Sequence, residues 1–464
     1  MSKTTKSTLN RALDINQNPQ IYGAFAEIGA GQEVARFFFQ AGQASATIAK
    51  TMSAYDMVYS DEIYGKEPNG RYVCESRLNK MLDKEYSLLI RRLDATRGKT
   101  STFFAYANTV TTGGQTKRVC HGWMGVRFQI KPGGEFNDII MHVRMLDKYR
   151  LQQQETLGVL GVNLVYTGFF AHAKADSFIE NLTENIKLGQ VVIDVIKTSG
   201  PDLAHLNNHL LNLELVRKGL AESVLFSSKK EIQFISDAIY NKPLIIQRGS
   251  FKPITNTQID ILNKGQDQFK KDFKSESKQA KVILELTMQN LNSKGQMQEQ
   301  DFLDRVSSLC DLGYDVLVSN FFLFYKLKNS LRQYTQSPIV FLISAAHLEK
   351  VFEEKYYEDL EGGILEGLGK LLDNKTNLYI YPHKTEKSCT TAAVYRPTGE
   401  MQNIYSYFMS KKFIVDVAGC DQIEEFIHSD DIQKLIKKGD KTWEKMVPTI
   451  IKDQIKKDKL FRFL

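Results

Sequence analysis

The sequence predicts an α/β protein whose main domain, residues 149–385, is a mostly parallel sheet preceded by an N-terminal α+β region. The first observation is a regular alternation of strand-like and helix-like segments from about residue 160, which is typical of βα units. The second is a group of three strand-like runs, separated by glycine- and proline-rich turns, between residues 102 and 146. The third is an ordinary composition, with 42% hydrophobic and 25% charged residues among 464, which predicts a chain that folds around a core.

The N-terminal part is predicted to hold a loose leader, residues 1–20, followed by the α+β region, residues 21–148. Leucines at helical spacing predict a helix over 75–93. The three strand-like runs cover 102–110, 122–130 and 138–146, and the short turns between them predict an antiparallel meander.

Residues 25–39 open a helix after a small-residue turn that resembles a phosphate-binding turn. The turn lacks the Lys-Ser/Thr pair of a P-loop, and no clear strand precedes it. We therefore interpret this segment as a helix that packs closely through Gly29, Gly31, Ala35 and Gly42.

The main domain is predicted to contain eight βα units. Strands are expected at 162–166, 191–196, 223–226, 244–247, 282–287, 315–319, 339–343 and 378–381. Helices are expected at 177–188, 203–219, 257–273, 301–312, 321–334 and 348–372. Eight units fit a (β/α)8 barrel, which we favour over an open doubly wound sheet. Residues 386–464 are predicted to form a C-terminal α/β extension, with a helix at 401–410, a strand at 413–417 and a charged helical tail.

Charge and cysteine content limit the expected partners and compartment. The net charge is +7, but 61 basic and 54 acidic residues are well mixed, so we expect no nucleic-acid partner. No apolar run is long enough to span a membrane, and the N-terminus lacks the apolar region of a secretory signal. The cysteines lack metal-ligand spacing, which predicts a cytoplasmic protein with buried or free thiols and no metal site; they are Cys74, Cys120, Cys310, Cys389 and Cys420.

Candidate site residues follow from the rule that parallel α/β sheets bind ligands at the carboxyl ends of their strands. Arg248 suits bidentate binding of a phosphate, Lys197 would act as a point charge, and turns with free N–H groups would complete an anion site. His383 and Glu285 are the candidates for acid/base catalysis. The expected anion or nucleotide ligands are Lys197, Ser199, Gly200, Arg248, Gly249, Ser250, Thr255 and Asn320.

Residues 249–257 read Gly-Ser-Phe-Lys-Pro-Ile-Thr-Asn-Thr and follow an apolar strand-like run. This stretch resembles the signature of the nucleotidylyltransferase superfamily, Gly-x-Phe-x-Pro-x-(His/Thr)-x-Gly-His after a first strand. In that family the turn cradles nucleotide phosphates and the last His stabilises the transferring phosphoryl group. The matching residues are Gly249, Phe251, Pro253 and Thr255, whereas Thr257 and Gln258 replace the Gly and the last His.

These departures affect what the resemblance implies. Gln258 can donate a hydrogen bond but carries no charge, so it would stabilise a phosphoryl transition state less well. The stretch also follows three predicted parallel strands rather than one, and the family's second signature, a Ser/Thr-Arg-Ser/Thr turn, is not evident. Both points argue against ordinary adenylyl transfer and leave a phosphate-binding turn beside Arg248.

Over its whole length the chain resembles a family of uncharacterised bacterial proteins that are often labelled nicotinamide or nicotinate mononucleotide adenylyltransferase, or sometimes TonB-dependent receptor. Residues 25–39, 47–57, 120–128, 248–255, 352–365 and 443–448 carry this resemblance. It implies a bacterial cytoplasmic protein. The receptor label conflicts with the absence of a signal peptide and of many alternating strands.

Two classes of function remain open from the sequence. The first is a nucleotidyl- or phosphoryl-transfer enzyme that binds a small phosphorylated molecule, with a nucleotide and magnesium as the candidate cofactors. The second is a non-catalytic assembly or regulatory protein, including a homo-oligomer, suggested by the aromatic runs 37–39 and 321–324. A dehalogenase-type phosphatase lacks its DxD pair, and a hydrolase elbow of the form GxSxG is missing.

Overall fold

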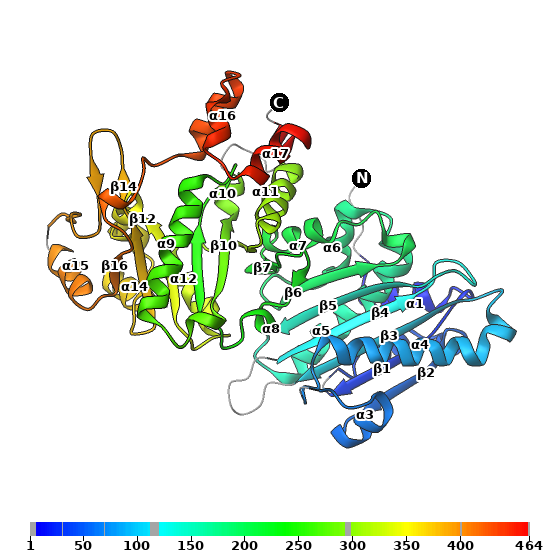
Figure 1. Ribbon diagram of the computed structural model, residues 1–464. Helices are drawn as coiled ribbons and strands as arrows, with labels where there is room; N and C mark the ends of the chain where they lie inside the picture. Colours follow the sequence, from blue (N-terminus) through cyan, green and yellow to red (C-terminus); the bar gives the residue numbers. More distant parts are fainter. Residues whose placement is uncertain are drawn as a thin grey trace. The chain divides into compact units, whose positions relative to one another are not determined.

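A computed structural model describes residues 6–29, 31–68, 70–111, 120–292, 298–399 and 401–462 (Figure 1). The chain divides into two compact units, Met1–Ala221 and Glu222–Leu464. The division therefore lies well after residue 148, where the sequence places the end of the N-terminal region. The predicted strand at 191–196 belongs to the first unit.

The first unit is built on a six-stranded mixed sheet. Its order is β2 (Ile48–Ala54), β1 (Ile21–Gly29), β3 (Thr102–Thr111), β4 (Cys120–Phe128), β5 (Asn137–Met145) and β6 (Val191–Ser199). Strand β1 runs parallel to both β2 and β3, whereas β3 to β6 pair antiparallel. The antiparallel meander and the α+β character of this region are confirmed, and β6 extends the meander by one strand.

Helices cover both faces of this sheet because successive strand residues point to opposite sides. Ala24 packs with Tyr86 of α4 (Glu75–Arg97), which lies along one face (Figure 1). The next residue, Phe25, packs its ring 5.0 Å from that of Phe38 on the other face. Helices α1 (Thr8–Asn16), α2 (Val34–Ala41) and α5 (Arg150–Tyr166) pack together on this second face. The unit also contains α3 (Met57–Tyr64), α6 (Phe178–Leu182) and α7 (Asn208–Arg217).

The strand expected at 162–166 is wrong, because these residues form the end of α5. Val162, Leu164 and Val165 are all fully buried in this helix. A short continuous apolar run has no period of its own, so burial on all sides gives the same sequence pattern in a helix and in a strand.

The second unit is built on an eight-stranded sheet in which six neighbouring strands are parallel. The parallel strands are β16 (Ile414–Asp416), β13 (Thr376–Tyr381), β12 (Ile339–Ser344), β9 (Leu244–Arg248), β10 (Lys281–Thr287) and β11 (Asp315–Ser319). Strands β7 (Ser223–Phe226) and β8 (Ile232–Gln233) continue the sheet antiparallel beyond β11. A separate hairpin pairs β14 (His383–Lys384) with β15 (Cys389–Thr390).

This sheet has two edges, β16 and β8, and the described residues form no closed barrel. The eight-unit barrel is therefore not confirmed, and the open, mostly parallel sheet is the observed architecture. The chain starts the parallel part at β9, adds β10 and β11 on one side, and then crosses to β12, β13 and β16 on the other. This order is that of a doubly wound sheet, with its topological switch point between β9 and β12.

Both faces of the parallel sheet are covered. Ile246 and Phe341 share a core with Leu327 of α12 (Phe324–Arg332) and Leu368 of α14 (Gly363–Leu371). On the opposite face Leu342 contacts Gly265 of α9 (Asn256–Asp272) so closely that a Cβ there would lie 2.4 Å from it. The other helices are α8 (Ile235–Ile239), α10 (Met288–Asn292), α11 (Glu299–Asp311), α13 (Leu348–Val351), α15 (Met401–Ser410), α16 (Ser429–Lys437) and α17 (Thr449–Lys457).

The cysteines depart from the expectation of thiols alone. Cys389 and Cys420 form a disulfide, with Cα atoms 6.2 Å apart, between β15 and the segment before α16. Cys74, Cys120 and Cys310 are buried free thiols. The pairing joins residues 31 apart in sequence, and such a separation has no local pattern that reveals it. Among the described residues no helix is both long and apolar enough to cross a membrane.

Candidate functional site

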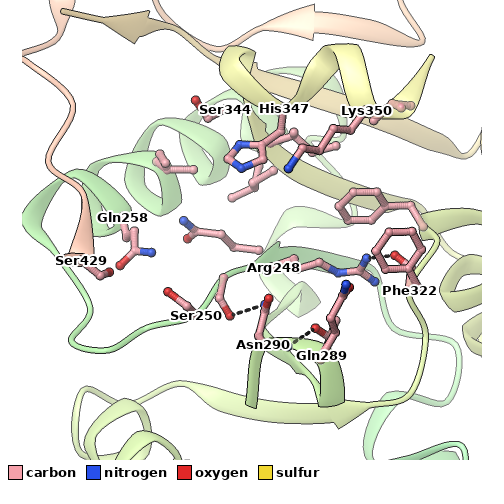
Figure 2. A pocket seen from close by; sticks show the side chains of 18 of the residues that line it. Arg248, Ser250, Gln258, Gln289, Asn290, Phe322, Ser344, His347, Lys350 and Ser429 are labelled. Atoms are coloured by element: carbon pink, nitrogen blue, oxygen red, sulfur yellow. Dashed lines mark hydrogen bonds between the residues drawn. The ribbon is translucent and has the colours of Figure 1, made fainter. Parts of the chain in front are cut away.

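A cavity of about 420 Å³ opens in the second unit at the carboxyl ends of β9, β10 and β12. It lies at the switch point, where the chain diverges from β9 to either side and side chains leave room for a ligand. Polar and aromatic residues line it from four sides (Figure 2). They include Gln247–Ser250, Gln258, Thr287, Gln289, Asn290, Phe322–Phe324, Ser344, His347, Lys350, Tyr356, Tyr357 and Phe426–Asp430.

The turn that follows β9 is fixed by hydrogen bonds from neighbouring segments of the second unit. The Gly249 N–H donates to Glu285 O (3.1 Å), and Asn290 Nδ2 donates to Gly249 O (3.1 Å). Arg305 Nη1 donates to Ser250 O at 3.0 Å. The Ser250 side chain lines the cavity and has no hydrogen-bond partner in the described part of the chain (Figure 2). The turn thus presents Ser250 to a ligand on a rigid backbone.

The geometry explains the Gly-x-Phe spacing. Phe251 is fully buried in the left-handed region, with φ of 46°, and its ring folds under the turn. A Cβ at Gly249 would lie 2.8 Å from that ring, closer than real Cβ contacts come. Glycine at 249 and phenylalanine at 251 are therefore two parts of one packed turn.

Helix α9 begins with a reciprocal cap. Thr255 Oγ1 accepts from the Gln258 N–H (3.2 Å), and Gln258 Oε1 accepts from the Thr255 N–H (2.9 Å). Thr255 is fully buried and does not line the cavity. The cap occupies the oxygen of the Gln258 amide and leaves its NH2 group at the cavity wall (Figure 2). Gln258 can therefore act there as a hydrogen-bond donor.

Arg248 and Glu285 form an internal ion pair rather than two separate site residues. Arg248 Nε and Nη2 donate to the two Glu285 oxygens at 2.8 and 3.0 Å, and Ser319 Oγ donates to the same carboxylate at 2.6 Å. A third N–H group of Arg248 donates to Phe322 O, and the guanidinium lies 4.2 Å over the Phe324 ring. Glu285 is fully buried and does not line the cavity. In this arrangement the Glu285 carboxylate holds Arg248, and three N–H groups of Arg248 are already bonded within the protein.

A segment far along the chain closes one side of the cavity. Residues 426–430, which we name the strap, lead into α16 and line the cavity. The Ile427 N–H donates to Thr257 Oγ1 (3.0 Å), and Ser429 Oγ donates to Pro253 O (2.8 Å). Gln433 Nε2 donates to Lys252 O (2.7 Å). The strap is thus attached to the turn and to the first residues of α9.

Basic side chains gather on the wall formed after β12 and on the strap. His347 and Lys350 follow β12, His428 belongs to the strap, and all three line the cavity. Desolvation by the surrounding protein lowers the pKa of His347, although the residue as a whole is exposed, and Lys350, His383 and His428 add to this shift. His383 lies beside the strap, its ring 5.7 Å from that of His428, but it does not line the cavity. Burial, followed by the charge of His428, lowers its pKa.

The opposite end of the cavity is aromatic. Phe322 is 48% exposed, and its ring centroid lies 5.3 Å from that of Tyr356. Figure 2 shows Phe322 on the side of the cavity away from Gln258 and Ser429. An exposed aromatic pair at a cavity wall suits a planar ring, which gains from stacking as well as from burial.

Several predicted site residues do not join this cavity. Lys197, Ser199 and Gly200 lie at the end of β6 in the first unit, and β6 pairs antiparallel with β5. Lys197 Nζ donates to both Glu75 oxygens at 2.8 Å. The expected grouping of these three residues with Arg248 is therefore wrong, since they belong to different sheets. Asn320 is exposed after β11, where its N–H donates to Glu222 O, and it does not line the cavity.

The residues that sequence reasoning missed come mainly from other parts of the chain. His347 and Lys350 follow β12 by a few residues, so a wider reading of the strand ends finds them. His428 carries no local signal, because only the tertiary path of the strap brings it to the cavity. In the described residues no group of three or more His, Cys, Asp or Glu side chains could hold a metal ion.

The aromatic runs that suggested an assembly protein have local roles. Phe38 is fully buried, whereas Phe39 of the same run is 54% exposed. Phe322 and Phe324 line the cavity, and the Phe324 ring packs against Arg248. The second run is thus explained by the cavity, and Phe39 is left exposed on the first unit.

No protein-family model matches the chain, and no curated protein does. Solved structures of CinA or competence/damage-inducible proteins are similar to about a third of it. The CihA protein of Agrobacterium tumefaciens shares 17% identity, covers 36% of this chain and 97% of its own, and has a TM-score of 0.26. A CinA superfamily protein of Enterobacter cloacae shares 12% identity over 36% of this chain and 95% of its own, also with a TM-score of 0.26. A likeness at this level supports no argument about function.

Proposed function

We propose that the second unit binds a nucleotide in the cavity at the switch point and is an enzyme of nucleotidyl or phosphoryl transfer. One observation supports this most. The Gly249–Phe251–Pro253 turn follows β9, the first parallel strand of a doubly wound sheet, and lines the cavity through Gly249 and Ser250. The resemblance to the nucleotidylyltransferase signature requires this position after a first strand.

The earlier objection to that resemblance came from strand order. The three strands that precede the turn in sequence do not belong to the parallel set. Residues 162–166 are helical, β6 lies in the other unit, and β7 is antiparallel to β11. With these removed, the turn takes the place that the signature has in its family. The absent final His remains a real departure.

The cavity offers complementary ends for the two parts of a nucleotide. At one end the Ser250 side chain and the Gln258 amide provide hydrogen-bond donors for phosphate. Lys350 adds positive charge, His347 and His428 add imidazole groups, and Phe322 with Tyr356 suits a base at the other end. A volume of about 420 Å³ is within the range of small-molecule sites. A magnesium ion would be held mainly by the phosphates, as is common for this ion.

In such a site catalysis would come from positioning and charge stabilisation rather than from a covalent intermediate. Gln258 would donate a neutral hydrogen bond to the transferring phosphoryl group. The Arg248–Glu285 pair would hold the Phe322 carbonyl and the Phe324 ring in place. The second substrate would be the molecule that accepts the phosphoryl or nucleotidyl group, and its chemical class is to be identified next.

The test is a thermal-shift screen with the four ribonucleoside triphosphates, each with and without magnesium. A ligand at a hundred times its Kd stabilises by roughly 2.7 kcal/mol, whatever the chemistry that follows. Gln258→Ala should reduce the shift, and Asn320→Ala, outside the cavity on the same sheet edge, should leave it unchanged. Absence of any shift for the wild-type protein would refute the proposal.

A further inference from the structure

We infer that His428 is the side chain that contacts the nucleotide phosphates and supplies the charge that Gln258 lacks. This inference rests on the proposed function, because it assigns a role within the same cavity. It differs from the mechanism of the resembling family, in which a histidine of the turn motif performs this task. Here the imidazole would come from the strap, which lies about 170 residues further along the chain than the turn. The hydrogen bond from Ile427 to Thr257 joins the two segments.

The first argument is the attachment of the strap on both sides of His428. The preceding residue, Ile427, donates its N–H to Thr257 Oγ1 at 3.0 Å, within the first turn of α9. The hydroxyl group of the following residue, Ser429, donates to Pro253 O at 2.8 Å, in the turn between β9 and α9. The backbone of His428 is therefore fixed beside the start of α9, where Gln258 also meets the cavity.

The second argument is the freedom of the imidazole itself. The His428 ring is tilted by 44° against the Phe426 ring, with centroids 4.8 Å apart, and lies 5.7 Å from the His383 ring. Neither imidazole nitrogen of His428 has a hydrogen-bond partner among the residues that the structure describes. The side chain is exposed and lines the cavity. Both of its nitrogens are thus available to a ligand.

The third argument is charge. Three basic side chains line the cavity beside Arg248, namely His347, Lys350 and His428. The lowered pKa of His347 favours its neutral form, and Arg248 is engaged with Glu285 and Phe322. Lys350 follows β12, on a different wall from the start of α9 (Figure 2). Asp430, two residues further along the strap, is the acidic residue of the cavity lining.

Isothermal titration tests this with ATP, GTP, CTP and UTP and with their four parent nucleosides. For the triphosphate that binds the wild-type protein, His428→Ala should weaken affinity roughly tenfold, as expected for losing a hydrogen bond to a charged group. Affinity for the matching nucleoside should stay the same. His205→Ala, an exposed histidine of the first unit, is the matched control and should change neither value.

A second substitution separates a phosphate contact from mere support of the strap. Gln258→His, made in the His428→Ala background, should recover most of the lost triphosphate affinity, because it returns an imidazole to the same phosphate. Unchanged triphosphate affinity in His428→Ala would overturn the inference while leaving the proposed function intact. Equal losses for nucleoside and triphosphate would also overturn it. If the wild-type protein binds no triphosphate, the proposed function itself fails.

Discussion

Both units contain a strand, a small-residue turn and a helix, but they use the start of the helix differently. In the first unit β1 leads into α2, and in the second β9 leads into α9. The Glu27 carboxylate accepts from the N–H groups of Val34 (2.9 Å) and Ala35 (3.4 Å) at the start of α2. At α9 the cap comes from Thr255 and Gln258, and the turn faces a cavity.

The difference shows that a glycine-containing turn before a helix does not by itself make an anion site. In the first unit the protein's own carboxylate takes the place of a ligand at the helix N-terminus. In the second unit the side chains that line the cavity beside the turn are neutral or basic, apart from Asp430, and the nearby Glu285 and Asp301 are paired with Arg248 and Lys252. The expectation for residues 25–39 is wrong in part, because residues 25–29 belong to strand β1 and α2 begins only at Val34. Close packing is found at Gly29 and Gly31 but not at Gly42, where a Cβ would meet no atom within 4 Å.

The largest expected effect is on stability and concerns the disulfide, which is found in the second unit among the described residues. The Cys389–Cys420 disulfide closes a loop of 31 residues next to the strap, whereas the cysteines of the first unit are buried thiols. Loop-closure entropy gives such a link about 3–4 kcal/mol. Reduction should lower the unfolding midpoint of the second unit alone, measured by urea denaturation with a dithiol reductant. The Cys389→Ser/Cys420→Ser double variant should not respond to the reductant, and a response there would disprove the assignment.

The next prediction concerns the carboxylate that fills the first turn. Burial raises the pKa of Glu27 to about 7, against the opposing effect of the Val34 and Ala35 N–H groups. The folded state keeps this proton up to pH 7, while the unfolded chain releases it near 4.5. Stability should therefore fall as pH rises from 4.5 to 7, by up to roughly 3 kcal/mol. In Glu27→Gln this pH-dependent part of the unfolding free energy should be absent, which urea unfolding curves at pH 5 and pH 8 would measure. A variant with the same pH dependence as the wild type would contradict the account.

The smallest effect tests the packing of the turn in the second unit. Gly249→Ala places a Cβ 2.8 Å from the Phe251 ring, so it should destabilise the second unit by about 1–3 kcal/mol. Gly369, in α14, has no atom within 4 Å of such a Cβ, and Gly369→Ala should be neutral or stabilising. Chemical denaturation of the two variants measures the difference. Equal stabilities would mean that the turn is not packed as described.

Local patterns predicted the elements of the second unit well. Strand β11 and helix α15 have the bounds expected from sequence, and α9 differs by one residue at each end. These segments have clear periods, and turn residues mark their ends. The capping box at Thr255 belongs to the same class of local signal.

Pairing between distant segments could not be predicted in the same way. The alternation near Lys197 looks like a βα unit, but β6 pairs with β5, and the sequence does not say which sheet a strand joins. The site has the same limit. Its first wall, Arg248 to Gln258, is continuous in sequence. His347 reaches the cavity only because the chain crosses the sheet to β12, and His428 only because the strap returns to it. The ion pair of Arg248 with Glu285 depends on the β9–β10 register, which no local pattern fixes.

The most direct test of the central claim is amide hydrogen exchange of the whole chain with and without a nucleoside triphosphate that gives a thermal shift. The account predicts slower exchange in residues 249–258 and 426–430 when the nucleotide is bound. Residues 31–35, at the start of α2, should exchange at the same rate in both states, because they do not line the cavity and Glu27 already occupies the N–H groups of Val34 and Ala35. Protection confined to residues 31–35, or none at 249–258, would contradict the placement of the site in the second unit.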